Sequence, residues 1–145
     1  MHGQLTVGAV CCLVNIAIHA AIMAWVVTAA RRASRATAGL GAMRHHIAVM
    51  GATVLVLLIA HVLEVGVWAL VYRLVDLVPA GDGFYFAFVN YTTLGYGDIL
   101  PHPEWRMLGP ITAMNGVLLF GWSTAVIFEV LRTSAGALRD LPTRS

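Results

Sequence analysis

Three long apolar segments constrain the fold of this chain most strongly. They cover about residues 5–30, 47–71 and 108–131, and each provides the roughly 20 mostly apolar residues that a helix needs to cross a bilayer. Over the whole chain, 59% of the residues are hydrophobic and only 11% are charged. The sequence therefore predicts an all-α membrane protein of one domain, with three transmembrane helices per chain.

The first apolar segment has the position of a secretory signal but not its pattern. No basic residue precedes it, its apolar run is too long, and its arginine pair, Arg31 and Arg32, follows the run. We therefore expect a retained helix. Trp68 and Trp105 lie near the expected outer interface, where aromatic anchors are common.

The placement of arginine predicts the orientation, because cytoplasmic loops are enriched in basic residues. Two regions carry most of the arginine, the connector after the first segment and the tail after the third. Their members are Arg31, Arg32, Arg35, Arg44, Arg132, Arg139 and Arg144. We expect both regions to be cytoplasmic, which places the N-terminus outside the cell (inner) membrane. The net charge of +2 is too small for a nucleic-acid partner.

A short motif lies between the second and third segments, where residues 92–98 read Thr-Thr-Leu-Gly-Tyr-Gly-Asp. The stretch before it, residues 84–91, would form a helix about 12 Å long, which cannot cross a hydrocarbon core of about 30 Å. Such a half-helix followed by extended backbone is tolerated only where it is buried in protein or lines a water-filled cavity. We therefore expect a re-entrant pore helix and a loop entering from the outer face.

The motif has the chemistry of a filter for K⁺. Backbone carbonyls of a Thr-x-Gly-Tyr-Gly strand, contributed by four chains, can replace the water shell of a K⁺ ion. Gly95 and Gly97 can adopt the positive φ that turns successive carbonyls inward. Thr93 adds a hydroxyl, and the Asp98 carboxylate raises the cation concentration at the outer end. A Gly-rich turn is the alternative, and the position between two apolar segments favours the filter.

From about residue 47 to residue 131, the chain resembles the pore module of the tetrameric potassium channel family. Residues 93–98 match the family's filter, with Leu94 where Val or Ile is commoner. The resemblance implies passive K⁺ conduction by a homotetramer in lipid, with no enzymatic activity, cofactor or small-molecule substrate. The implied K⁺ sites are formed by Thr93, Leu94, Gly95 and Tyr96, the filter ends at Gly97, and Thr92, Tyr85 and Asp98 support it.

The resemblance also sets the expected organisation of the chain. Residues 1–44 form an extra N-terminal helix and its connector, residues 45–132 form the pore module, and residues 133–145 form a short cytoplasmic tail. The parts of the module are an outer helix at about 47–71, a pore helix at about 83–92, the filter at 93–98 and an inner helix at about 108–131. The family pattern does not cover the extra helix.

Two features of the module concern its mechanics. Tyr85 falls where voltage-gated relatives have a Trp that bonds the filter Asp, so we hypothesise that its hydroxyl donates to Asp98 and braces the filter. The neighbouring subunit could supply that Asp98, and simple packing of the ring is the alternative. Gly116 falls near the glycine hinge that the family often has in its inner helix, and Gly121 offers a second point of bending.

Polar residues within the apolar segments form a candidate cluster. His61 and Glu64 are three residues apart and share a helix face, and His19 on the first helix would lie at a similar depth. Ionisable groups at that depth usually face protein or a cavity. Three interpretations remain open: a hydrogen-bonded staple between helices, a pH-sensitive latch, and a metal site.

Glu129 near the end of the third segment has two interpretations. Four copies facing the pore axis would form an acidic ring at the inner mouth, which we favour slightly, whereas pairing with Arg132 would have little effect. For the whole protein, the alternative to a channel is a non-conducting regulatory, metal-sensing or pH-sensing subunit. A membrane redox or metal-handling enzyme that uses Cys11, Cys12, His19 and His61 is a third class.

Overall fold

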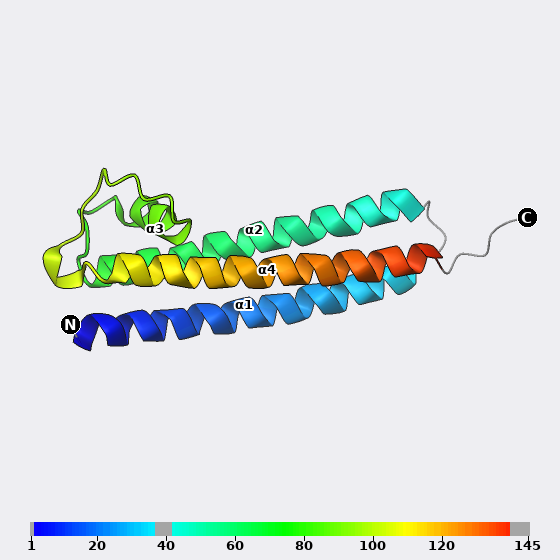
Figure 1. The fold of residues 1–145 in the computed structure, drawn as a ribbon, viewed down its shortest axis with the longest axis horizontal. Coiled ribbons are helices and arrows are strands. Elements are labelled where there is room, and N and C mark those ends of the chain that lie inside the picture. Colours follow the sequence, from blue (N-terminus) through cyan, green and yellow to red (C-terminus); the bar gives the residue numbers. More distant parts are fainter. Residues whose placement is uncertain (1, 37–41, 140–145) are drawn as a thin grey trace, which may run out of the picture. The chain divides into compact units, whose positions relative to one another are not determined.

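A computed structural model describes residues 2–36 and 42–139 of the chain. Every regular element in these ranges is helical (Figure 1). The elements are α1 (His2–Ala36), α2 (Ala42–Leu74), α3 (Gly83–Tyr91), the short 3₁₀ helix η1 (Pro103–Trp105) and α4 (Leu108–Arg139). Residues 37–41 of the expected connector, and residues 140–145 of the expected tail with Arg144, lie outside the described residues.

Three of these helices are long and apolar enough to cross a membrane, with 18-residue windows whose mean hydropathy is 2.3, 2.5 and 1.6. The all-α fold with three membrane-spanning helices and a short helix before the filter segment is therefore confirmed. The long helices extend beyond the apolar runs, because helical hydrogen bonding continues into polar flanking residues. As a result, α4 includes residues 133–139, where the sequence predicted a tail.

The described chain groups into two compact units, and each long helix contributes residues to both. The first unit comprises Met1–His19 and His61–Gly121, and the second comprises Ala20–Ala60 and Trp122–Ser145. The whole of α3 and the filter segment belong to the first unit. The second unit has its own apolar core, formed by Met23, Val26, Ala30, Leu57, Val126 and Val130.

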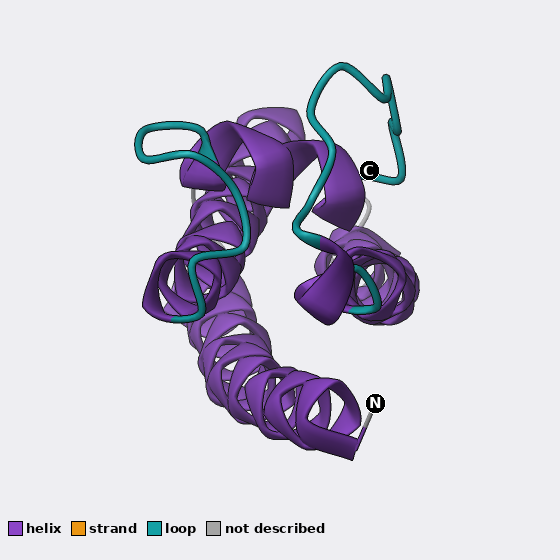
Figure 2. Ribbon diagram, turned by 90° about the vertical axis from the view of Figure 1, so that its left-hand side faces the viewer, coloured by secondary structure: helices purple, strands orange, loops and turns teal. Residues whose placement is uncertain are grey.

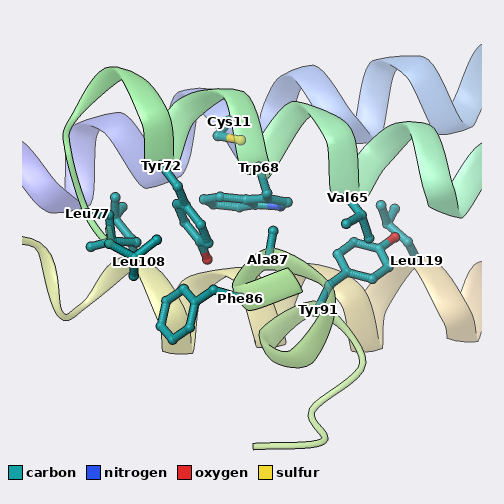
Figure 3. Packing of buried hydrophobic residues seen from close by; sticks show 11 residues of the cluster. Cys11, Val65, Trp68, Tyr72, Leu77, Phe86, Ala87, Tyr91, Leu108 and Leu119 are labelled. Carbon is teal, nitrogen blue, oxygen red and sulfur yellow. The ribbon is translucent and has the colours of Figure 1, made fainter. Parts of the chain in front are cut away.

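The core of the first unit is aromatic (Figure 3). Trp68 and Tyr72 of α2 lie with ring centroids 6.0 Å apart, and Tyr72 lies 5.6 Å from Phe86 of α3. Trp68 is fully buried, so the sequence-based expectation of an exposed interfacial anchor is wrong for this residue. These rings fix α3 against the end of α2, which determines where the filter segment begins.

Two loops flank α3 in the first unit, drawn in teal in Figure 2. They are joined at one point, because the His102 N–H donates to the Leu77 carbonyl at 2.9 Å. The second loop contains Pro101, and Pro103 is the first residue of η1; both lack a backbone N–H donor and so oppose a continued α-helix. Pro110 lies in the first turn of α4, where the missing N–H has no helical acceptor to lose.

Candidate functional site

The filter segment, residues 93–98, follows α3 after the single residue Thr92 and has an alternating backbone conformation. Thr93, Gly95 and Gly97 have φ values of 60°, 59° and 74°, in the left-handed region. Carbonyls of an ordinary strand alternate in direction, so a left-handed residue at every second position brings them to one side. The positive φ predicted for Gly95 and Gly97 is confirmed. Thr93 was missed, because a β-branched residue rarely adopts this conformation.

The first residues of the segment are held by the end of α3. The Thr93 N–H donates to the Asn90 carbonyl, and the Leu94 N–H donates to the Val89 carbonyl, both at 2.9 Å. These bonds satisfy carbonyls that a helix end otherwise leaves open. In the described chain, no backbone–backbone hydrogen bond involves residues 95–97. The main-chain polar groups of these three residues are therefore available to other partners.

Tyr85 of α3 and Asp98, the last residue of the filter segment, are joined by a hydrogen bond. The Tyr85 hydroxyl donates to Asp98 Oδ2 at 2.7 Å, within the same chain. This hydrogen bond to a carboxylate raises the pKa of the Tyr85 hydroxyl. The bond that the sequence hypothesis required is present, and its role in bracing the filter stays a prediction.

His19, His61 and Glu64 lie together within the first unit, and Tyr91 joins them. His19 Nδ1 lies 2.8 Å from Glu64 Oε1, and His61 Nδ1 lies 2.9 Å from Glu64 Oε2. The Tyr91 hydroxyl donates to Glu64 Oε2 at 2.5 Å and lies 3.0 Å from His61 Nδ1. His19 and Glu64 are fully buried. Three helices, α1, α2 and α3, therefore meet at one carboxylate, as the interhelical staple requires.

A second buried polar group lies beside this cluster and was not predicted. Asn115 Oδ1 of α4 accepts from Asn15 Nδ2 at 3.1 Å and from Trp68 Nε1 at 3.0 Å. The Asn15 amide also donates to the Glu64 carbonyl at 3.3 Å. The i, i+4 spacing of Asn15 and His19 was visible in the sequence, but nothing in the sequence indicates Asn115 as their partner. Together, the two groups connect all four α-helices of the first unit.

The two candidate hinge glycines have different surroundings. A Cβ on Gly116 would overlap the main-chain carbonyl of Tyr91, whereas a Cβ on Gly121 would meet no heavy atom within 4 Å. Both residues lie within the continuous helix α4. Close packing against α3 therefore requires glycine at position 116 whether or not the helix bends there.

Glu129 lies in the second unit and forms two ion pairs. Its Oε1 is 3.3 Å from Arg31 Nη2, and its Oε2 is 3.3 Å from Arg132 Nη2. The second of these is the i, i+3 pair that the sequence offered as the alternative to an acidic ring. The contacts favour pairing over the ring that we had preferred. The side chains of Arg35 and Arg139 lie outside the described residues.

The fold and the site together define a class of protein. It is a multi-pass membrane protein in which a short helix and a glycine-containing segment connect two spanning helices. A family model described as "Ion channel" matches residues 53–133, which is more than half of the chain. The chain therefore belongs to this ion channel family. Among curated proteins and solved structures, no match was found. The matched region begins within α2, so α1 lies outside the part that defines the family.

Proposed function

We propose that this ion channel is selective for K⁺ and conducts as a homotetramer. The observation that carries the proposal is the alternation of left-handed residues along Thr-Leu-Gly-Tyr-Gly, since it directs successive carbonyls to one side. Four such strands around an axis provide rings of carbonyl oxygens that replace the water shell of the ion. The permeant ion is the only ligand that this function requires.

The proposed ion sites are the carbonyls of Thr93, Leu94, Gly95 and Tyr96, together with the Thr93 hydroxyl. K⁺ would pass through them in single file, without its water shell. Repulsion between ions at neighbouring sites offsets tight binding, so selection remains compatible with fast exit. The Asp98 carboxylate at the outer end would raise the local concentration of cations.

The exposure of the filter segment in a single chain supports assembly around an axis. Leu94 and Tyr96 are 52% and 69% exposed. The main chain of residues 95–97 has no backbone partner in the described chain. Irregular backbone at membrane depth is stable only when it is buried in protein or lines a wet cavity. Neighbouring copies would supply the packing on one side and the ion path on the other.

The proposed orientation places the filter at the outer face of the cell membrane. Arg31 and Arg32 follow the first apolar run in the sequence and Arg132 follows the third, whereas the filter segment precedes the third, so the enrichment of arginine on the cytoplasmic side favours this orientation. The N-terminus would then be outside and the C-terminus cytoplasmic. Surface labelling of a single cysteine introduced at Gly3 in intact cells would test this assignment.

Flux measurements in proteoliposomes test the proposal. Purified protein in vesicles with an outward K⁺ gradient should release K⁺ when a proton ionophore balances charge, and Ba²⁺ should block the release. Gly95→Ala places a side chain at a left-handed position and should abolish the flux. Gly66→Ala, where a Cβ meets nothing within 4 Å, is the matched control and should conduct.

A non-conducting regulatory subunit is the second candidate, and the buried cluster at His19, His61 and Glu64 favours it. That candidate predicts folded tetramers or other oligomers that give no Ba²⁺-sensitive flux. The size of the particle is a separate readout. A monomer or a dimer by native mass measurement would contradict the channel proposal even if some leak were present.

A further inference from the structure

The cluster at Glu64 brings together three side chains that commonly bind metals. His19, His61 and Glu64 each offer one ligand atom, and these atoms all lie within 4.8 Å of one another. His19 comes from α1, and the other two come from α2, one helical turn apart. His19 and Glu64 are fully buried, whereas the His61 side chain is 14% exposed. The donors therefore converge at a point that is enclosed but accessible from one side.

The negative charge of the Glu64 carboxylate favours binding of a cation in the cluster. A buried carboxylate in a membrane is stable only when it is paired. Among the described residues, the ion-pair partners of Glu64 are His19 and His61, which carry charge only when they are protonated. A divalent cation at this point would neutralise the carboxylate without requiring a protonated imidazole.

The donor set matches the preference of one class of ion. Neutral imidazole nitrogens and carboxylate oxygens are common ligands of Zn²⁺, at about 2.0–2.2 Å in tetrahedral geometry. An oxygen that could serve as the fourth ligand is present, because the Tyr91 hydroxyl lies 2.5 Å from Glu64 Oε2 and 3.0 Å from His61 Nδ1. Hard cations such as Mg²⁺ prefer oxygen ligands and would not select two histidines.

We propose that His19, His61 and Glu64 form a binding site for Zn²⁺ or a similar divalent transition metal, with Tyr91 or water as the fourth ligand. The hydrogen bonds of 2.8 and 2.9 Å to Glu64 describe the metal-free state. Binding replaces the proton in each of these bonds with the metal. Tetrahedral ligands at about 2.0 Å from a metal lie about 3.3 Å apart. The two hydrogen-bonded pairs must therefore each separate by about half an ångström, whereas any pair nearer the 4.8 Å limit of the set must approach.

Metal binding would have a structural consequence that depends on α1. His19 is the only member of the ligand set on the extra helix, and Tyr91 is the last residue of α3. A bound metal would therefore fix α1 to α2 at the depth where the filter segment begins. None of these residues is one of the proposed K⁺ ligands at positions 93–96, so metal binding can be measured whether or not the protein selects K⁺.

Cobalt provides a direct probe of the site. The full-length protein in detergent micelles, after treatment with a chelator, should bind one Co²⁺ per chain and show the intense visible d–d absorption of a tetrahedral site. Zn²⁺ should displace the Co²⁺ and remove the absorption. Glu64→Gln and His19→Gln should each weaken Co²⁺ binding at least ten-fold. His45→Gln and His102→Gln remove histidines outside the cluster and should leave binding unchanged.

Two results would overturn the proposal. One is Co²⁺ absorption that is weak, as in an octahedral aqua complex, or that persists in the Glu64→Gln and His19→Gln variants. The other result comes from the wild-type protein, so it does not depend on a variant that folds. It is an X-ray absorption spectrum of the Zn²⁺-loaded protein that shows no scattering from imidazole ligands. If the cluster binds protons but no metal, Co²⁺ should show only the weak absorption of its aqua complex, which is the first of these results.

Discussion

Gly116 of α4 packs against Tyr91, the last residue of α3, so closely that a Cβ on residue 116 would overlap the Tyr91 carbonyl oxygen. Only Thr92 separates Tyr91 from the filter segment. The contact between these two residues therefore helps to determine where the filter starts. The sequence indicated Gly116 as a hinge, and the structure supplies a packing reason for glycine that needs no bending.

Replacing Gly116 with alanine should displace α3 from α4. Overpacking of this kind destabilises a protein by about 1–3 kcal/mol, and here the overlapping atom is backbone, which cannot rotate away. We expect Gly116→Ala to lose filter-dependent flux and to lower the thermal midpoint. Gly121→Ala is the matched control and should retain both, since a Cβ there meets nothing within 4 Å. A Gly116→Ala protein with wild-type stability and changes only in opening would support the hinge instead.

The hydrogen bond from Tyr85 to Asp98 should stabilise the conducting form of the filter. A hydrogen bond to a charged group contributes more than one between neutral groups, and exposure to solvent, as at Tyr85, reduces that contribution. Tyr85→Phe should keep the fold and make the current decline faster under sustained recording. Tyr72→Phe, which breaks a buried bond to Thr112, controls for the loss of a hydroxyl elsewhere. Equal decay in wild type and Tyr85→Phe would exclude bracing.

Glu64 should contribute strongly to the stability of the first unit. Its carboxylate accepts from three side chains while fully buried, and removing one partner from such a group typically destabilises by about 1–3 kcal/mol. Glu64→Gln keeps the shape but provides only one acceptor oxygen, so the midpoint of unfolding in denaturing detergent should fall clearly. Tyr91→Phe should give a smaller decrease. An unchanged midpoint in Glu64→Gln would show that the cluster is not a staple.

Glu129 should have little influence on conduction. Its partners Arg31 and Arg132 are 57% and 75% exposed, and exposed ion pairs contribute about 0–1 kcal/mol. Single-channel conductance in Glu129→Gln should therefore equal that of the wild type at low and high salt. A marked decrease at low salt, where an acidic ring would concentrate cations most, would restore the inner-mouth hypothesis.

The sequence was sufficient for the features that depend on local composition. Long apolar runs predicted α1, α2 and α4, and the short aromatic stretch before a Gly-Tyr-Gly run predicted α3. Helix ends were less accurate, because hydropathy marks the hydrocarbon-crossing part of a helix and not its hydrogen-bonded length. The positive φ of Gly95 and Gly97 followed from the absence of a side chain.

Features that depend on contacts between helices could be predicted only in part. The spacing of His61 and Glu64 predicted that both lie on one face of α2. The sequence did not mark Tyr91 as their partner, because it is one of several aromatic residues in α3. Asn115 and Trp68 likewise gave no signal of their hydrogen bond, because a membrane helix is apolar on all sides and its pattern does not mark the buried face. The left-handed conformation of Thr93 opposes its own preference and is imposed by its surroundings.

The reversal potential of the reconstituted channel, with K⁺ on one side of a planar bilayer and Na⁺ on the other, tests the central claim most directly. Rings of carbonyls that replace the water shell of K⁺ predict a large shift toward the K⁺ equilibrium potential, and loss of that shift in Gly95→Ala. A reversal potential near zero in the wild-type protein would contradict the account, since it would mean that the filter segment does not distinguish the two ions.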